Sequence, residues 1–438
     1  MSDARPSNFD LKAALQEAEE RFAAANPRSA SAYEAACSAM PGGNTRTVLY
    51  YPPFPLSLAG GEGCHVEDLD GHRYADFVVE QTAGLYGHSN PVIRTAILEA
   101  LERGITLGGP TPMEAELAEL LCARFPALDL VRFTNSGTEA NLLALSAARA
   151  ATGRSRIMAF EGCYHGSVLS FGGYGNALNV PFPMVMAPYN DAERTRALIA
   201  EHAADLAAVI IEPMTGSGGC IPATQDFLHM LREETERRGI VLIFDEVMTS
   251  RLGPRGLQGL VGVTPDMMTM GKYLGGGLTF GGFGGRRDIM ERFDPRRPGA
   301  FGHAGTFNNN VLTMAAAVAG LRHVFTPDAA ATMNALGDEL RGRLNALIAR
   351  HGVAGQVTGI GSMMMLHLTG APLRGPQDTA AVPADARALF HLEMIARGCY
   401  VARRNMMVLS LPMGAAEFDT LAAAFDDFLA SYRSLLAA

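Results

Sequence analysis

Residues 240–246 have the sequence Ile-Val-Leu-Ile-Phe-Asp-Glu, and they indicate the fold class more directly than any other part of the chain. Five consecutive apolar residues are typical of a strand covered on both faces, since a strand with one face in water alternates apolar and polar side chains. The run ends at Asp245 and Glu246. Ligands of parallel sheets bind beyond the carboxyl ends of the strands. The stretch therefore predicts a buried parallel strand with a carboxylate, Asp245, beside a ligand site.

Similar apolar runs occur on both sides of this strand in the sequence. Candidate strands lie at 130–134, 156–160 and 207–211, and they alternate with helix-like stretches at 138–151 and 224–238. Strands that alternate with helices favour βαβ units and a parallel sheet. We therefore expect an α/β fold with a mostly parallel central sheet.

The two ends of the chain have different patterns. Apolar residues recur at helical spacing over 11–22, and short apolar segments alternate with turn residues over 52–77, which is typical of a small antiparallel sheet. Towards the carboxyl end we expect a long amphipathic helix at 329–351, strands at 363–368 and 408–411, and a terminal helix. These changes in pattern predict three sections, namely residues 1–77, 78–326 and 327–438.

Composition and charge exclude several classes of protein. The chain has 438 residues, of which 48% are apolar and 18% are charged, so it can bury a large core and is too apolar to be disordered. No uninterrupted apolar run approaches the ~18 residues that a membrane-spanning helix needs. The formal net charge of −9 offers no positive excess for nucleic acid or for an anionic membrane surface. We therefore expect a globular protein whose partners are small molecules.

The cysteines and the first residues bear on the cellular compartment. The six cysteines are scattered without a Cys-x-x-Cys pair, which fits neither a disulfide framework nor a zinc site, so we expect reduced thiols and no bound metal. The sequence MSDARPSNFD at 1–10 has neither the basic start nor the apolar segment of a signal peptide. Both features predict a cytoplasmic protein.

A candidate anion site lies where the strand at 130–134 ends. The sequence at 134–139 is Thr-Asn-Ser-Gly-Thr-Glu, which places Ser136 at the start of the next helix with a glutamate three residues later. This spacing is typical of a capping box and, on its own, indicates only a well-capped helix. The backbone N–H groups and hydroxyls of Ser136, Gly137 and Thr138 are also the groups that bind a phosphate.

Lys272 is the candidate nucleophile. Only two of the 36 lysines and arginines are lysines, Lys12 and Lys272, so arginine fills nearly every basic position. A surface ion pair tolerates arginine, whereas Schiff-base chemistry does not, because a guanidinium is not a usable amine nucleophile. Lys272 precedes three glycines at 275–277, whose backbone can bend around a planar group. Lys12 lies on a helix face and is expected to be a solvated charge.

An aromatic segment completes the pattern. The sequence at 160–166 is Phe-Glu-Gly-Cys-Tyr-His-Gly, directly after a candidate strand, so Tyr164 is in a position to cover a planar ring. On its own this segment indicates an aromatic turn, and Asp245 on its own indicates a capped strand end. Together, a phosphate site, a lysine nucleophile, a buried acid and an aromatic cover describe a pocket for pyridoxal phosphate (PLP).

Over nearly its whole length the chain resembles the class III, or ω, aminotransferases of fold type I. The motifs that carry the resemblance occur in the family's order and spacing: Asn135-Ser-Gly-Thr-Glu-Ala140, Tyr164-His-Gly166, Phe244-Asp-Glu-Val-Met248, Gly271-Lys272 and Gly305-Thr306. The resemblance implies a PLP enzyme whose large domain holds a mostly parallel sheet. It also implies a smaller α+β domain built from the two chain ends.

The resemblance assigns roles to individual residues. It implies that Lys272 forms the Schiff base with PLP and moves the substrate proton, and that Asp245 pairs with the pyridine nitrogen. The other implied cofactor contacts are Tyr164 over the ring, Glu212, the phosphate-binding residues Ser136, Gly137 and Thr138, and Thr306 from the neighbouring subunit. This arrangement implies a homodimer with its active sites at the interface.

Two subfamilies share these motifs. The segments 160–166 and 275–278 resemble glutamate-1-semialdehyde aminomutases, which move an amino group within one molecule, but 170–180 is shorter than the gating loop expected of that enzyme. Other segments resemble the aromatic β-amino acid (β-phenylalanine) aminotransferases: 41–49, 51–56, 82–89, 305–310 and 408–412. We therefore favour a transaminase and keep the aminomutase as the alternative. A non-catalytic PLP-fold regulator is a second alternative, which the presence of Lys272 and Asp245 disfavours.

A transaminase of this kind passes the amino group of a β-amino acid to 2-oxoglutarate and needs a cation for each carboxylate. Arginine suits this task because it forms two parallel hydrogen bonds with a carboxylate. The resemblance implies that Arg46 holds the carboxylate of the β-amino acid and that Arg404 holds that of 2-oxoglutarate. The sequence around residue 404 departs from the subfamily pattern, so Arg403 is the alternative there. Taken alone, these arginines are equally compatible with surface charges.

Overall fold

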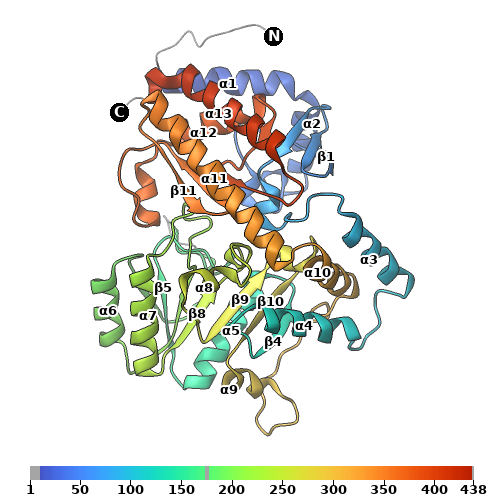
Figure 1. The fold of residues 1–438 in the computed structure, drawn as a ribbon, viewed down its shortest axis with the longest axis vertical. Coiled ribbons are helices and arrows are strands. Elements are labelled where there is room, and N and C mark those ends of the chain that lie inside the picture. The colour runs from blue at the N-terminus through green and yellow to red at the C-terminus, as the bar shows by residue number, and fades with distance from the viewer. Residues whose placement is uncertain (1–9, 173–176, 437–438) are drawn as a thin grey trace.

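The computed structural model describes residues 10–172 and 177–436, which form a larger and a smaller region (Figure 1). The larger region contains a seven-stranded sheet, and the smaller region contains a four-stranded and a three-stranded sheet. The segment 170–180 lies partly outside the described residues, and the stretch 1–9 lies wholly outside them. None of the helices in the described part of the chain has the length and apolar character that a membrane crossing requires.

The sheet of the larger region is parallel except for one strand. Its strand order is β4 (Leu130–Thr134), β10 (Gly281–Gly285), β9 (Met267–Gly271), β8 (Val241–Asp245), β7 (Leu206–Ile211), β5 (Arg156–Phe160) and β6 (Met184–Ala187). β10 is antiparallel to both of its neighbours, and the remaining pairs are parallel. The prediction of an α/β fold with a mostly parallel sheet is confirmed, and the candidate strands correspond to β4, β5, β7 and β8.

Helices surround this sheet (Figure 1). The helices of the larger region are α3 (Pro91–Glu102), α4 (Pro112–Arg124), α5 (Gly137–Thr152), α6 (Ala192–Glu201), α7 (Gln225–Arg238), α8 (Gly256–Val261), α9 (Arg287–Met290) and α10 (Val311–His323). Short 3₁₀ helices occur at Thr249–Arg251, Lys272–Gly275 and Glu291–Phe293, and a turn with positive φ angles occurs at Val79–Thr82. The expected helices at 138–151 and 224–238 are α5 and α7.

The continuous apolar run of β8 reflects cover on both faces of the sheet. Leu242 and Phe244 pack in an apolar cluster with residues of α7. Val241 and Ile243 point the other way and pack in a second cluster with residues of α5. Successive side chains of a strand point to opposite faces, so every residue of β8 is buried.

β10 is a strand that the apolar pattern does not predict, because four of its five residues are glycine. A Cβ atom at Gly281 would lie 2.1 Å from the carbonyl oxygen of Ser136. A Cβ atom at Gly284 would lie 2.4 Å from the carbonyl oxygen of Leu130. Glycine is therefore required for this close approach of the backbone, which brings β10 against the loop that carries Ser136.

The smaller region is built from both ends of the chain, as the resemblance implies. One sheet has the order β1 (Leu58–Glu62), β2 (His65–Asp68), β3 (Arg73–Asp76) and β13 (Cys399–Tyr400). β1, β2 and β3 are antiparallel, as predicted for 52–77, whereas β13 pairs in parallel with β3. The helices are α1 (Leu11–Ala25), α2 (Pro27–Cys37), α11 (Pro327–His351), α12 (Ala384–Ala396) and α13 (Ala415–Leu436), with 3₁₀ turns at Pro41–Gly43, Thr47–Leu49 and Pro376–Ala381.

The second sheet of the smaller region corrects one expectation. Its strand order is β11 (Gln356–Ile360), β12 (Met363–His367) and β14 (Met406–Val408). The expected strand at 408–411 is therefore wrong, since β14 ends where the expected strand begins. Val408 pairs with Met363, the first residue of β12, so the ladder has no further partner. The chain then leaves the sheet, and the carbonyl group of Leu409 accepts a hydrogen bond from Arg251. The division into three sections stays a prediction.

Candidate active site

Predicted site residues collect at one edge of the large sheet. They follow the carboxyl ends of five strands: Ser136 after β4, Tyr164 after β5, Glu212 after β7, Asp245 at the end of β8, and Lys272 after β9. Because these strands run in the same direction, their carboxyl ends meet at one edge. The structure therefore brings the five residues to the place where the fold class puts ligands.

Lys272 is held at this edge in a conformation that lysine rarely adopts. It directly follows β9, and its backbone φ of 56° lies in the left-handed region. Burial lowers the pKa of its amine to about 8, and the charges of Arg404 and Arg46 act in the same direction. The amine forms no hydrogen bond or ion pair with any described residue. A lysine in this state supplies a free amine near neutral pH, which is what a nucleophile needs.

Asp245 is a buried carboxylate with a full set of donors. Its side chain is 4% exposed. Its Oδ2 atom accepts hydrogen bonds from Asn141 Nδ2 at 2.8 Å and from His165 Nδ1 at 2.8 Å. Its Oδ1 atom accepts one from the backbone N–H of Val247 at 3.0 Å. These contacts fix the carboxylate in orientation at the end of β8.

Asn141 and His165 are functional neighbours that the sequence patterns did not single out. Asn141 also donates to the carbonyl oxygen of His165 at 2.9 Å and accepts from the hydroxyl of Thr269 at 2.6 Å. The Nε2 atom of His165 is buried without a hydrogen-bond partner. The position of Asn141 in the sequence could have identified it. It is a polar residue between Ala140 and Ala144 on the buried side of α5, where apolar side chains are expected.

The loop before α5 has the features of an anion site. Ser136 is the N-cap, and its hydroxyl oxygen accepts the N–H of Glu139 at 3.2 Å, so the predicted helix cap is present. The N–H groups of Gly137 and Thr138, in the first turn, have no partner within the helix. A Cβ atom at Gly137 would lie 2.8 Å from Val247, so this position requires glycine. The free N–H groups therefore lie next to the segment that follows Asp245.

Tyr164 and Glu212 are linked to each other. The Glu212 carboxylate accepts the N–H of Tyr164 at 2.8 Å and the N–H of Gly216 at 2.9 Å. Burial raises the pKa of Glu212 to about 7. The Tyr164 side chain is 45% exposed, which leaves its ring free to cover a ligand. Glu212 thus holds the backbone of the segment that carries the aromatic ring.

The structure separates Arg404 from Arg403. Arg404 and Arg46 lie close enough to Lys272 and Tyr164 to shift the pKa of each. The guanidinium of Arg404 donates to the amide oxygen of Gln81, and Arg46 pairs with the carboxylate of Glu80. Arg403 has a different environment, with Glu19, Arg387, Tyr50 and Tyr51 as its charged or titratable neighbours. Arg404, rather than Arg403, is the arginine on the Lys272 side of this loop.

Thr306 lies in the segment between β10 and α10, and its side chain is exposed. In the same segment, Asn308 accepts a hydrogen bond from Asn135 Nδ2 at 3.0 Å. This segment therefore borders the loop before α5. The contact of Thr306 with a second subunit stays a prediction.

The chemistry of this site fits PLP. The fit rests on an amine without a partner, a buried carboxylate with donors on both oxygens, and a helix start with free N–H groups, all at one sheet edge. The family model of the class III aminotransferases matches residues 50–387, which include all three of these groups. The chain belongs to the class III aminotransferases. It is a PLP-dependent transaminase.

Relatives of this aminotransferase support the assignment. The β-phenylalanine transaminase of Variovorax paradoxus is 51% identical over 97% of this chain and 97% of its own. The crystal structure of a β-phenylalanine aminotransferase from that organism superposes with a TM-score of 0.96 at 50% identity, covering 98% of this chain and 99% of the other. A glutamate-1-semialdehyde aminomutase of Methanosarcina acetivorans is 37% identical over 85% of this chain and 91% of its own. A transaminase solved with PLP bound has a TM-score of 0.86 at 35% identity, covering 94% of this chain and 98% of the other.

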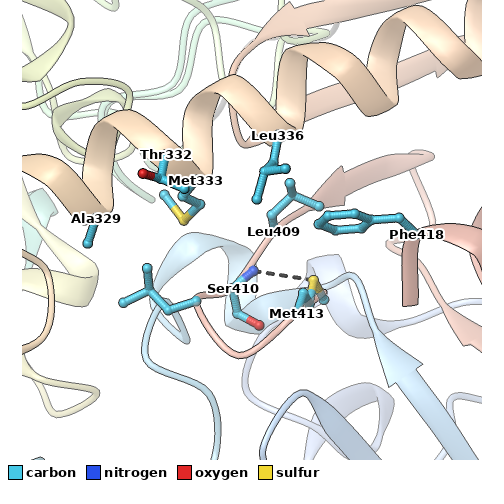
Figure 2. A pocket seen from close by; sticks show the side chains of 9 residues that line it. Ala329, Thr332, Met333, Leu336, Leu409, Ser410, Met413 and Phe418 are labelled. Carbon is cyan, nitrogen blue, oxygen red and sulfur yellow. Dashed lines mark hydrogen bonds between the residues drawn. The ribbon is translucent and has the colours of Figure 1, made fainter. Parts of the chain in front are cut away.

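A cavity of about 250 Å³ lies apart from the site of the aminotransferase (Figure 2). It lies between α11 and the segment that follows β14, and Figure 2 shows Met333 and Leu336 facing Leu409 and Phe418 across it. None of its lining residues is a predicted site residue. Its lining is mostly apolar, with Thr332 and Ser410 as the polar residues and no charged side chain.

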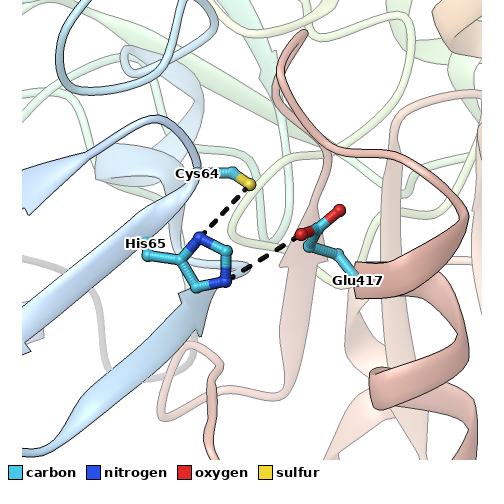
Figure 3. Close-up of side chains that lie close together, drawn as sticks. All are labelled: Cys64, His65 and Glu417. Carbon is cyan, nitrogen blue, oxygen red and sulfur yellow. Dashed lines mark hydrogen bonds and ion pairs between the residues drawn. The ribbon is translucent and has the colours of Figure 1, made fainter.

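A cluster of three possible metal ligands, Cys64, His65 and Glu417, lies in the smaller region (Figure 3). Figure 3 shows His65 between the other two, with one ring nitrogen towards each. The Nδ1 atom lies 3.6 Å from the sulfur of Cys64, and the Nε2 atom lies 3.9 Å from the Glu417 carboxylate. The three candidate ligand atoms lie within 4.8 Å of one another, and the Glu417 carboxylate also interacts directly with the Cys64 thiol, whose pKa is raised by burial and by that carboxylate.

Proposed function

We propose that this aminotransferase transfers the amino group of an aromatic β-amino acid, of the β-phenylalanine type, to 2-oxoglutarate in two successive half-reactions at one site. The observation that carries the proposal is that Arg46 and Arg404, from separate loops, contact the adjacent residues Glu80 and Gln81 and both lie near Lys272, where their charges add to the effect of burial in lowering the pKa of its amine. Two cations near one amine suit an enzyme whose amino donor and amino acceptor bind in turn, because each of these substrates carries a carboxylate. The similarity to the β-phenylalanine transaminase of V. paradoxus supports this substrate class.

The cofactor contacts are part of the same proposal. Lys272 would bond to PLP, Asp245 would pair with its pyridine nitrogen, and Tyr164 would cover the ring, while Glu212 holds the backbone of Tyr164. Ser136, Gly137 and Thr138 would hold the phosphate, together with Thr306 from a second copy of the chain. When bound, PLP supplies a carbonyl group that condenses with amines and a ring that withdraws electrons from the carbon that loses a proton.

Lys272 would act as the carrier of the proton of the substrate carbon. Its pKa of about 8 leaves a useful fraction of free amine near neutral pH, so it can remove a proton from the substrate carbon and later return one. Asp245 accepts three hydrogen bonds, which fix the orientation of its carboxyl group. A negative charge at that point favours a protonated pyridine nitrogen.

The two arginines divide the carboxylates between them. Arg46, which is partly exposed, binds the carboxylate of the β-amino acid, and Arg404 binds the distal carboxylate of 2-oxoglutarate. The Nε atom of Arg404 is enclosed and has no hydrogen-bond partner among the described residues. A guanidinium with an unused donor in an enclosed position is well suited to an incoming anion.

We also propose that the enzyme is a cytoplasmic homodimer. All six cysteines are free, which suits a reducing compartment. Phe307, next to Thr306, is 60% exposed, and large exposed apolar side chains near a functional segment suit a subunit interface.

The test incubates the PLP-loaded enzyme with β-phenylalanine, with and without 2-oxoglutarate, and follows glutamate. We expect glutamate only when both substrates are present. The aminomutase is the competing function, because a relative with that name is 37% identical. Production of 5-aminolevulinate from glutamate-1-semialdehyde, without glutamate formation from β-phenylalanine, would overturn the proposal.

A further inference from the structure

Four consecutive residues before α3 adopt a left-handed backbone. The φ angles of Val79, Glu80, Gln81 and Thr82 are 47°, 45°, 54° and 83°. None of these residues is glycine, and for the β-branched Val79 and Thr82 such angles are genuine outliers. Strain of this kind persists only where the surrounding structure enforces it, and it concentrates at functional sites. We call residues 79–82 the left-handed turn.

The left-handed turn is fixed at both ends. At its start, Asp76 Oδ1 accepts the N–H groups of Val78 at 2.9 Å and Val79 at 3.0 Å. At its end, the buried Arg251 donates to the carbonyl oxygen of Thr82 at 3.2 Å. Val79 is 1% exposed and Thr82 is fully buried. The two residues between them are therefore presented in a defined orientation.

Each of these two residues contacts one of the arginines beside Lys272. The Glu80 carboxylate pairs with Arg46, and the Gln81 amide oxygen accepts a hydrogen bond from Arg404. Adjacent positions of one strained turn thus hold both arginines. Their chemistry differs, because Glu80 carries a negative charge and Gln81 carries none.

The difference leaves the two arginines with unequal capacity for an anion. The charge of Arg46 is already balanced by Glu80 in an exposed pair. Among the described residues, Arg404 donates hydrogen bonds only to neutral acceptors, the Gln81 oxygen and the sulfur of Met406 at 3.7 Å, and the charge of Glu212 acts on it without an ion pair. A carboxylate that reaches Arg46 has to compete with Glu80, whereas one that reaches Arg404 has no ion-paired carboxylate of the described residues to displace.

We propose that the left-handed turn determines how the two carboxylate sites differ: Glu80 competes with ligands for Arg46, and Gln81 orients Arg404 without neutralising it. The proposal rests on the proposed function and identifies Glu80 and Gln81 as positioning residues that act through the arginines. The aromatic monocarboxylate therefore binds Arg46 against competition. The second carboxylate of the acceptor binds Arg404 without it.

The test measures binding of carboxylates that cannot react, by calorimetry on the PLP-loaded enzyme. The probes are 3-phenylpropionate, with one carboxylate, and glutarate, with two. In Gln81→Glu, we expect the Kd of glutarate to rise by about tenfold or more and that of 3-phenylpropionate to change by less than about threefold. In Glu80→Gln, the Kd of 3-phenylpropionate should fall by about threefold or more.

Double variants show whether these residues act through the arginines. In an Arg404→Gln background, Gln81→Glu should weaken glutarate binding no further, and in an Arg46→Gln background, Glu80→Gln should give no gain. Both substitutions at the left-handed turn keep the shape of the side chain, and the absorbance of bound PLP reports whether the site is intact. Additive effects in the double variants, equal weakening of both probes by Gln81→Glu, or weaker 3-phenylpropionate binding in Glu80→Gln would each overturn the proposal.

These readouts separate this inference from the proposed function. If the glutarate and 3-phenylpropionate pattern holds but β-phenylalanine yields no glutamate, the left-handed turn keeps its role and the substrate class is wrong. If glutamate forms but the binding pattern fails, the inference alone is wrong.

Discussion

Lys272 and Lys12, the only two lysines of the chain, occupy opposite environments. Lys12 is exposed on α1, in the smaller region, whereas Lys272 directly follows β9 and has an amine whose pKa is lowered by burial. The contrast makes Lys12 a natural control. It carries the same chemical group without the environment that activates it.

We expect Lys272→Ala to abolish transamination, because Lys272 is the only lysine that the described part of the chain places at the sheet edge. Lys12→Ala should retain activity close to that of the unmodified enzyme. Borohydride reduction of the PLP-loaded enzyme, followed by peptide mapping, should place the reduced cofactor on Lys272. A label found on Lys12 would contradict the assignment.

Asp245→Asn should bind PLP but lose about a hundredfold or more in kcat, because a neutral amide does not favour the protonated pyridine nitrogen. Asp266→Asn is the matched control, since Asp266 is a buried carboxylate (5% exposed) before β9, bonded to Arg232 and Arg286. That variant should lower the unfolding midpoint and leave kcat nearly unchanged. Equal kcat values for Asp245→Asn and the unmodified enzyme would show that Asp245 is only structural.

At the scale of elements, the end of β3 links a titratable group to the left-handed turn. Asp76 Oδ1 receives the N–H groups at the start of the turn, while its Oδ2 lies 3.0 Å from Nε2 of His88. The hydrogen bond with Asp76 raises the pKa of His88 despite partial burial. A protonated His88 therefore stabilises the arrangement that fixes the turn.

The pH dependence of this contribution has a definite sign. A folded-state pKa above the unfolded value of ~6.5 gives stability that is fully present below pH ~6.5 and is lost as pH rises through the folded value. Urea unfolding at pH 6 and pH 8 should therefore show a larger loss of stability for the unmodified enzyme than for His88→Gln. An identical change in both proteins would contradict the pairing with Asp76.

The elements also show what sequence patterns can and cannot predict. Apolar runs such as 240–244 predicted the buried strands, because cover on both faces requires consecutive apolar side chains. The glycine-rich β10 was missed, since its residues serve the close approach of the backbone. The polar residues that follow the strand ends were predicted, but Glu80 and Gln81 were not. A positive φ angle at a residue other than glycine cannot be recognised from the sequence. The role of Glu80 and Gln81 depends on contacts with Arg46 and Arg404 that only the fold creates.

For the whole molecule, exposed apolar side chains gather near Thr306. Ile105, Leu107 and Phe307 are 45%, 55% and 60% exposed. Their two segments touch, because Asn309 Nδ2 donates to the carbonyl oxygen of Gly109 at 3.3 Å. The segment of Phe307 also borders the loop of Ser136 through Asn308 and Asn135. A second copy placed on this surface would lie beside the active site.

We expect sedimentation of the unmodified enzyme to give a dimer and Phe307→Glu to shift it towards a monomer with little activity, because a charge in an apolar interface is costly. Leu260→Glu is the matched control, since Leu260 on α8 is 55% exposed but is distant in sequence from both segments. That variant should remain dimeric and active. A fully active monomer of the unmodified enzyme would contradict the interface.

The pairing of β3 with β13 bears on how the chain is made. Ala75 and Asp76 pair with Cys399 and Tyr400, which the ribosome adds more than three hundred residues later. At typical rates of synthesis this delay is on the order of tens of seconds. During that time β3 has an unpaired edge, and such edges promote aggregation of nascent chains. The larger region, whose strands are all encoded between residues 130 and 285, can form its sheet before the sheet of β1–β3 is complete. A chain truncated near its carboxyl terminus would therefore have a folded larger region and an incomplete amino-terminal sheet that is prone to aggregation.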